Sequence, residues 1–305
     1  MWVFLLKSKI SEQLDYFFII NPIAGKTRPA EAAEKIHRVF RAQEVNYSIQ
    51  QSTYPGEAID LARKASQKGT EVVVAVGGDG TVNEVVNGIE GSPVKLGVIP
   101  SGTGNDFAYS FNIPDDIAEA CRILLAGKTR MIDLGQVNDR KFINLVGVGF
   151  DGAVAEMTNR RSKIFRGSLM YVISVLRKLV TYRPLELKIG LDGEFFRMSP
   201  MLMAVGIGKS YGGGFKIVPD AVQDDGLFDI CIIDRVNPVE ALPYLVGGLR
   251  GTHLGLKKTE IYRAKTVSIE APKPLPYHIE GEVFHDDRLE FSLIQGGIEV
   301  IVGDI

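Results

Sequence analysis

Between residues 16 and 130, short runs of apolar residues alternate with stretches in which apolar residues recur at helical spacing. Runs of four or five apolar residues without a polar interruption are typical of strands that helices cover on both faces. The predicted strands are 16–20, 72–76 and 96–99, and helical spacing is clearest at 82–89 and 117–124. This alternation predicts an α/β domain with a mainly parallel, doubly wound sheet.

After residue 131 apolar and polar residues alternate within the strand-like runs, as is typical of antiparallel sheets. The predicted strands are 185–191, 227–233, 266–270 and 289–294, and one helix interrupts them at about 165–181. A chain of 305 residues is long enough for about two domains. We therefore expect an α/β domain over 1–130 and an all-β domain over 131–295, packed closely around a shared cleft.

The composition excludes several classes of protein. The 35 Lys and Arg residues are balanced by 37 Asp and Glu residues, so no nucleic acid partner held by bulk charge is expected. Cys121 and Cys231 are too few and too far apart for a disulfide framework or a thiolate zinc site. No apolar run approaches the ~18 residues of a membrane span, and Lys7 interrupts the apolar start too early for a signal peptide. These features predict a soluble, cytoplasmic protein.

Glycine-rich loops follow three of the predicted strands. The loop 77–81 lies between a buried strand and a helix, where free backbone N–H groups favour an anion. Because Asp79 would repel a bare phosphate, its carboxylate is better explained as part of a magnesium and water network on a nucleotide. A similar loop at 97–106 and a third at 21–27 leave strands at the same edge of the sheet. Together the loops predict a nucleotide site at that edge.

Two familiar phosphate-binding motifs are excluded by spacing. Gly25-Lys26-Thr27 resembles the end of a P-loop, but Ile20 stands where the first glycine is required. The G-x-G-x-x-G pattern is missing from the first strand–helix turn, which argues against a dinucleotide-binding dehydrogenase.

Four segments resemble, in order and spacing, the diacylglycerol kinase catalytic domain family, which includes bacterial lipid kinases, sphingosine kinases and ceramide kinases. They are 21–26, 77–84, 100–108 and 144–151. The resemblance covers nearly the whole chain. It implies a phosphofructokinase-like nucleotide-binding domain, a C-terminal β-sandwich domain and a cleft between them, and it implies that a last segment, about 296–305, returns to the first domain.

The resemblance also implies that the chain binds ATP and Mg²⁺. The residues implied at the nucleotide are Asn21, Thr53, Gly77, Gly78, Asp79, Gly80, Thr81, Gly102, Thr103, Asn105, Asp106 and Asp133. Of these, Asp79, Asp106 and Asp133 would hold the catalytic magnesium through water. On the residues alone these carboxylates could also be helix caps, as Asp106 before Phe107 would be.

Phosphoryl transfer to an alcohol needs a carboxylate that accepts the hydroxyl proton. The family takes this base from an Asp-Gly-Glu sequence near the C-terminus, where this chain has Glu280-Gly281-Glu282. The resemblance thus makes Glu280 the predicted base, with Glu282 shaping the site and Asp79 as the third catalytic residue. A glutamate reaches about one carbon further than an aspartate, which puts the rate in doubt. A second Asp-Gly-Glu, at 192–194, is better explained as a hairpin turn.

Residues 219–227 resemble the family's structural magnesium loop. Asp225 would bind the cation through its carboxylate, with backbone carbonyls from Val222 and Leu227, and a hard cation favours such oxygen ligands. The alternative is an ordinary Asp-Gly turn before a strand. None of the four histidines has metal-ligand spacing, so all are interpreted as structural or surface residues.

Between Arg160 and Arg183 the chain holds seven basic residues and no acidic one, interleaved with apolar residues. This mixture suits a helix that rests on an anionic membrane surface, and the alternative is a helix packed on the β domain with a solvated basic edge.

These observations predict a cytoplasmic enzyme, peripheral to the inner face of the membrane, that transfers the γ-phosphoryl group of ATP to a lipid hydroxyl. The favoured acceptor is diacylglycerol, and the product is then phosphatidic acid. One alternative is an NAD kinase, whose family shares the Gly-Gly-Asp-Gly-Thr loop. Another is a catalytically silent lipid-binding regulatory protein, suggested by Glu280 at the position of the base. The sequence leaves the acyl chains and the oligomeric state open, including a homodimer.

Overall fold

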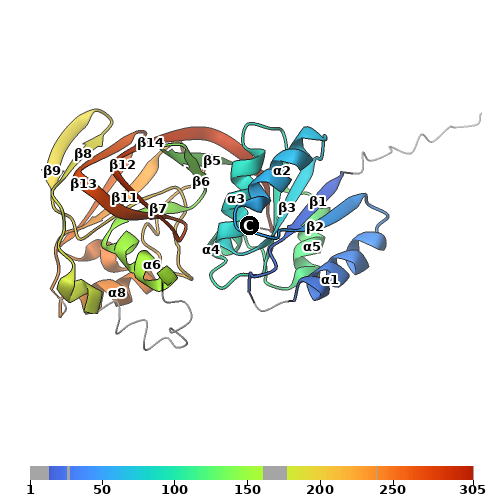
Figure 1. The fold of residues 1–305 in the computed structure, drawn as a ribbon, viewed down its shortest axis with the longest axis horizontal. Coiled ribbons are helices and arrows are strands. Elements are labelled where there is room, and N and C mark those ends of the chain that lie inside the picture. Colours follow the sequence, from blue (N-terminus) through green and yellow to red (C-terminus); the bar gives the residue numbers. More distant parts are fainter. Residues whose placement is uncertain (1–13, 26–27, 161–176, 238, 305) are drawn as a thin grey trace, which may run out of the picture.

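The computed structural model describes residues 14–25, 28–160, 177–237 and 239–304 of the chain. These residues form two lobes, one at each end of the molecule, that are connected by long strands (Figure 1). The strands belong to one mixed sheet of 14 strands. Backbone hydrogen bonds therefore continue from one lobe into the other.

The first lobe is built from alternating strands and helices, as predicted. The elements are β1 Tyr16–Ile20, α1 Pro29–Arg41, β2 Tyr47–Gln51, α2 Glu57–Gln67, β3 Val72–Gly77, α3 Asp79–Ile89, β4 Lys95–Pro100, α4 Asp106–Ser110 and α5 Ile117–Ala126. The strands pair in parallel in the order β4-β3-β1-β2. The helices α1 and α5 pack on one face of this sheet and α2 and α3 on the other (Figure 1). The predicted doubly wound α/β domain is therefore confirmed.

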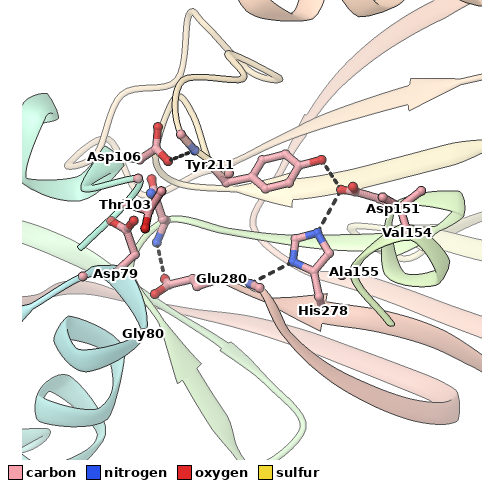
Figure 2. Close-up of a pocket in the computed structure, with 16 residues that line it drawn as sticks. Asp79, Gly80, Thr103, Asp106, Asp151, Val154, Ala155, Tyr211, His278 and Glu280 are labelled. Carbon is pink, nitrogen blue, oxygen red and sulfur yellow. Dashed lines mark hydrogen bonds and ion pairs between the residues drawn. The ribbon is translucent and has the colours of Figure 1, made fainter. Parts of the chain in front are cut away.

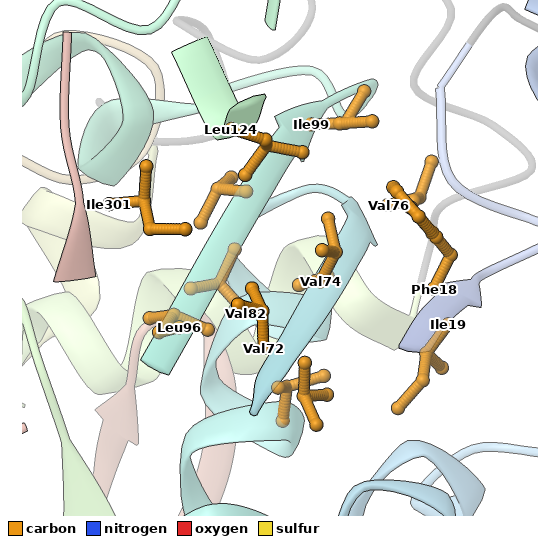
Figure 3. Close-up of a cluster of buried hydrophobic side chains, with 14 of the residues drawn as sticks. Phe18, Ile19, Val72, Val74, Val76, Val82, Leu96, Ile99, Leu124 and Ile301 are labelled. Atoms are coloured by element: carbon orange, nitrogen blue, oxygen red, sulfur yellow. The ribbon is translucent and has the colours of Figure 1, made fainter. Parts of the chain in front are cut away.

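The core of the first lobe explains why its strands are apolar throughout. Every residue of β3 is buried, and its valines pack against β1 and β4 (Figure 3). A central strand covered on both faces has no position that solvent reaches, so no polar residue is required. Helix α5 has a sequence signal at each end. The Asp116 side chain accepts the Glu119 N–H at its start, and Gly127, with φ of 66°, ends it.

The second lobe is mainly antiparallel, which confirms the predicted class. Its elements are β5 Thr129–Val137, β6 Arg140–Phe142, β7 Leu145–Gly149, α6 Phe150–Arg160, β8 Leu187–Leu191, β9 Glu194–Met198, β10 Leu202–Gly206, β11 Phe228–Ile233, α8 Ala241–Arg250, the 3₁₀ turn η1 His253–Gly255, β12 Thr259–Ala264, β13 Val267–Ile279 and β14 Glu282–Ile301. The helix predicted at 165–181 falls mostly outside the described residues, and 177–181 are helical.

The hairpin predicted at 192–194 is confirmed. Leu191 pairs with Glu194, so only Asp192 and Gly193 connect β8 and β9. Both have positive φ, of 48° and 90°, as a two-residue type I′ turn requires. This second Asp-Gly-Glu therefore lies in a turn at the far end of the second lobe (Figure 1).

Strand β14 crosses from the second lobe into the first (Figure 1). Near its start it pairs with β13, and near its end Val300 pairs with Leu96 of β4. The strand changes register between Ile294 and Ile298, around two glycines. Near its end, Ile298, Val300 and Ile301 are buried in the hydrophobic core of the first lobe.

Candidate active site

A pocket of about 360 Å³ lies between the two lobes. The first lobe contributes residues of two glycine loops to its wall. The second lobe contributes the residue before β7, residues of α6, the 211–213 loop, and residues of the end of β13 and the β13–β14 turn. The wall residues are Gly78, Asp79, Gly80, Thr103, Gly104, Asp106, Asn144, Asp151, Val154, Ala155, Tyr211, Gly212, Gly213, His278, Glu280 and Gly281. Figure 2 shows the carboxylates of Asp79, Asp106 and Glu280 on one side of this pocket. The predicted cleft is thus a polar pocket that both lobes build.

The three predicted loops meet at the carboxyl ends of β1, β3 and β4. A Cβ atom on Gly102 would lie 2.3 Å from Cα of Gly78, and one on Gly25 would lie 1.3 Å from the Ser101 carbonyl oxygen. The loops therefore approach each other backbone to backbone, at positions where no side chain fits. Asn21 adds a side-chain link between loops, because its Nδ2 donates to Thr81 Oγ1 at 2.9 Å.

Asp79 lies at the start of α3 and reaches the start of α4. Its Oδ1 accepts the Phe107 N–H at 3.0 Å, so it caps α4 from another helix. Burial raises the pKa of the Asp79 carboxyl, and the nearby Asp106 carboxylate raises it further. A Cβ atom on Gly104 would lie 2.9 Å from Asp79 Oδ2 and 3.2 Å from Asp106 Oδ2, so the two carboxylates face the same small space. A buried pair of this kind is stabilised by a cation.

Asp106 does not cap its own helix, α4, contrary to the alternative that its carboxylate is only a helix cap. Its two carboxylate oxygens accept the backbone N–H groups of Gly213 and Gly214, at 2.7 and 2.8 Å. These glycines belong to the second lobe and have φ of 86° and 105°, values that side-chain-bearing residues rarely adopt. The contact connects the nucleotide loop predicted in the first lobe to the opposite wall of the pocket.

Glu280 lies in the turn between β13 and β14. Ile279 pairs with Glu282, so Glu280 and Gly281 alone form this turn, with φ of 50° and 94°. Glu280 Oε1 accepts the N–H groups of Ile143 and Asn144, both at 2.8 Å. Burial raises the pKa of Glu280 to about 8, against the lowering effect of these two hydrogen bonds. The Asp79 carboxylate adds to the increase. The carboxyl is therefore able to exchange a proton near neutral pH.

A hydrogen-bonded cluster of Asp151, Tyr211 and His278 forms the wall beyond Glu280 (Figure 2). His278 Nδ1 accepts the Gly281 N–H at 3.2 Å, which leaves Nε2 protonated to donate to Asp151 Oδ2 at 2.9 Å. The Tyr211 hydroxyl donates to the same oxygen. The sequence interpretation of His278 as merely structural therefore missed its place in the pocket wall. No short-range motif marks it, because its partner lies in a different element, α6.

Eight of the predicted nucleotide and catalytic residues do not line the pocket. Five of them stand in the glycine-rich loops that reach it: Asn21, Gly77, Thr81, Gly102 and Asn105. The other three, Thr53, Asp133 and Glu282, belong to other segments. Thr53 Oγ1 donates to Glu57 at 2.7 Å, at the start of α2. Asp133 is fully buried, and its oxygens accept the N–H groups of Gly226 and Gly296, so the structure does not bring it to Asp79 and Asp106. Glu282 is exposed on β14. The roles assigned to Thr53, Asp133 and Glu282 remain predictions, because none of these three residues lies in the wall of the pocket.

The loop at 219–227, which was predicted to bind a structural cation, pairs with an arginine side chain in this structure. The carboxylate of Asp225 forms an ion pair with Arg263, and its other oxygen accepts the Leu227 N–H at 3.1 Å. Arg263 also contacts Asp229, at 3.2 Å. Val222, one of the two residues predicted to offer a backbone carbonyl, is exposed, and the other is Leu227. Because the guanidinium already neutralises Asp225, the loop as arranged does not fit a bound cation.

Among the described residues, no three His, Cys, Asp or Glu side chains are grouped so that they could hold a metal ion by themselves. Asp79 and Asp106 could nevertheless hold Mg²⁺ jointly with phosphate oxygens, because this ion is usually bound by one or two carboxylates plus substrate phosphates and water. The residues present therefore fit a cation that arrives with a nucleotide.

A second, apolar cavity of about 330 Å³ adjoins the polar pocket. The two share Asp151, Val154, Tyr211 and Gly212 in their walls. The remaining wall of the second cavity is almost entirely apolar and comes mainly from α8, with one residue each from β10 and β11 and with Leu179 from the described end of the predicted basic region. A molecule with a polar head and an apolar tail fits such a pair of cavities.

The predicted membrane contact at 160–183 lies mostly outside the described residues. Within the described part, none of the helices has the length and apolar character needed to span a bilayer.

Comparison with known proteins gives a consistent result. Residues 15–137 match the family model described as "Diacylglycerol kinase catalytic domain", and 144–302 match "YegS C-terminal NAD kinase beta sandwich-like domain". The diacylglycerol kinase of Bacillus subtilis (strain 168) is 34% identical over 271 residues, covering 87% of this chain and 88% of that protein. The diacylglycerol kinase of Staphylococcus carnosus (strain TM300) is 33% identical over 284 residues, with 92% and 93% covered.

The fold is also similar to solved structures. A crystal structure of a diacylglycerol kinase from Bacillus anthracis str. Sterne has a TM-score of 0.73, with 22% identity and coverage of 95% of this chain and 97% of that one.

Proposed function

Because the chain belongs to the diacylglycerol kinase catalytic domain family and is a lipid kinase, we propose that it transfers the γ-phosphoryl group of ATP, with Mg²⁺, to the hydroxyl of diacylglycerol. The observation that carries the proposal is the junction of a carboxylate-lined polar pocket with an apolar cavity. The polar pocket suits phosphates and their cation, and the apolar cavity suits an acyl chain.

The glycine loops of the first lobe would bind the phosphates. Their backbone N–H groups lie at the start of α3 and α4, where helix ends favour anions. Asp79 and Asp106 would hold Mg²⁺ at this point. Once bound, the ion supplies positive charge to phosphate oxygens as negative charge shifts between them.

Glu280 would act as the base. As the lipid hydroxyl oxygen bonds to the γ-phosphorus, the bond from that phosphorus to the bridging oxygen of ADP breaks, and Glu280 takes the hydroxyl proton. The N–H groups of Ile143 and Asn144 fix the carboxylate in the pocket at 2.8 Å. The Asp151–His278 pair supports the same turn through Gly281, so it positions the base.

An assay with labelled ATP, mixed micelles of diacylglycerol, and NAD in a parallel reaction tests the proposal. We expect label in phosphatidic acid and none in NAD. Label in NAD instead of lipid would show an NAD kinase. This alternative is the relevant one because the family model that matches the second lobe is described as NAD kinase-like. Folded protein that labels neither acceptor would show a silent module.

The backbone contact between the loops provides a further test. Gly102→Ala would force a Cβ to within 2.3 Å of Gly78 Cα, so the two loops must separate. We expect a loss of about 1–3 kcal/mol of stability and weaker ATP binding. The matched control is Gly80→Ala in the neighbouring turn, where no atom lies within 4 Å of the added Cβ. Calorimetric melting of the two variants checks this, and equal melting temperatures would contradict the close approach.

A further inference from the structure

Helix α8 and the turn before it carry a stripe of exposed apolar side chains, the α8 stripe. Val239, Leu242, Val246 and Leu249 are 85%, 62%, 41% and 51% exposed. Their spacing of three, four and three residues places them along one side of a helix. The helix buries Ala241, Gly247 and Gly248, so the stripe is the side that remains uncovered.

The α8 stripe borders the apolar cavity. Leu242, Val246 and Leu249 are part of the wall of that cavity as well as of the exposed surface. Across the cavity, Val154 of α6 belongs to the walls of both the cavity and the polar pocket. Apolar surface therefore continues from solvent at α8 to the catalytic pocket, on the side of the second lobe where α6 and α8 lie (Figure 1).

The surroundings of the stripe are basic although the chain as a whole has a net charge of −2. Residues 234–258 include four basic residues, Arg235, Arg250, Lys257 and Lys258, and two acidic ones, Asp234 and Glu240. Glu240 is already paired with Lys258, at 2.8 Å. This arrangement complements an anionic surface and not a basic one.

Building on the lipid acceptor proposed above, we propose that the α8 stripe docks on an anionic lipid bilayer. Its apolar side chains enter the boundary between headgroups and acyl chains, and the basic residues contact the lipid phosphates. The mouth of the apolar cavity then opens toward the bilayer, so a lipid reaches the pocket without crossing water. A bilayer is favoured over a second protein chain because the stripe continues into a cavity that fits an acyl chain.

Vesicle co-sedimentation tests the surface directly. The wild-type protein is expected to bind vesicles of phosphatidylcholine with phosphatidylglycerol, and Leu242→Glu to bind about tenfold more weakly. Phe195→Glu is the control, because Phe195 is 60% exposed on β9, away from α8. Arg250→Glu is expected to weaken binding to the anionic vesicles only. Equal binding by the wild type and Leu242→Glu, or an equal loss in Phe195→Glu, would overturn the proposal.

A fluorescent label gives a second readout that does not depend on loss of binding. Burial raises the pKa of the Cys121 and Cys231 thiols to about 12, so a cysteine introduced at the surface is labelled selectively. An environment-sensitive dye on Leu242→Cys is expected to shift to the blue when vesicles are added, and the same dye on Phe195→Cys is not. A shift that follows protein concentration without vesicles would instead show that a second copy covers the stripe, which would overturn the proposal.

The docking surface and the proposed function fail in different ways. Phosphorylation of diacylglycerol in micelles with no vesicle-dependent shift at Leu242→Cys would leave the function intact and refute the surface. A shift without phosphorylation of any diacylglycerol would support the surface and refute the acceptor.

Discussion

Asp79→Asn is expected to lower kcat by about three orders of magnitude while the protein remains folded. The amide oxygen of asparagine can still accept the Phe107 N–H, at 3.0 Å in the wild type, so the link between α3 and α4 is retained. The negative charge that would hold Mg²⁺ is lost. Stabilisation of phosphate charge by a metal ion contributes several kcal/mol, and about 1.4 kcal/mol corresponds to a factor of ten. Steady-state assays at saturating ATP measure the change.

Melting temperatures separate this effect from misfolding. Burial raises the pKa of Asp79, so the folded protein without ligand holds the proton to higher pH than the unfolded chain does. The stability contributed by this group therefore falls as pH rises through that interval. At neutral pH Asp79→Asn should melt at the same temperature as the wild type or higher, but should lose the increase that Mg²⁺ and ATP give the wild type. A kcat near the wild-type value would contradict the assigned role.

Glu280→Gln is expected to lower kcat by about 10²- to 10⁴-fold with little change in ATP affinity. The glutamine oxygen can accept the same N–H groups of Ile143 and Asn144, so the turn should stay in place while the proton acceptor is lost. Glu282→Gln is the matched control, since Glu282 is exposed and does not line the pocket. Single-turnover assays and nucleotide titrations measure the two quantities. Similar losses in both variants would argue against Glu280 as the only base.

The pH dependence of the same carboxyl gives an independent check. Because burial raises the pKa of Glu280 to about 8, the free enzyme carries this group largely protonated at pH 7. The value of kcat/KM should therefore rise with pH through about 8, and Glu280→Gln should lack this rise. The stability contributed by Glu280 without ligands should fall between about pH 4.5 and 8, where the folded state holds the extra proton. A flat kcat/KM profile in the wild type would contradict the assignment.

The sequence was sufficient to predict the α/β class and three of the four parallel strands of the first lobe, because the apolar runs that mark those strands are local. The strands at 16–20, 72–76 and 96–99 were predicted to within one residue at each end. Strand β2, Tyr47–Gln51, was not predicted, because an edge strand with one partner needs only partial burial and its residues are largely polar. In the second lobe, 266–270 and 289–294 were only parts of β13 and β14, whose irregular pairing interrupts the alternating pattern.

The candidate site was predictable where its residues are contiguous. Asp79, Thr103 and Asp106 belong to two glycine loops, and each loop is a recognisable sequence. The opposite wall was largely missed, because Tyr211 and His278 meet Asp151 across 60 and 127 residues of chain. Contacts at that separation depend on how β7, β10 and β13 pair, and no local spacing encodes this. Glu280 could be identified only through resemblance.

The path of β14 has a consequence for biosynthesis. The strands and helices of the first lobe precede the second lobe in the chain, yet the buried Ile298, Val300 and Ile301 that complete the core of the first lobe are synthesised only after the second lobe. Until they emerge, β4 lacks its neighbour on that side and a hydrophobic surface stays exposed. The first lobe of the nascent chain is therefore expected to stay prone to aggregation until β14 has been synthesised.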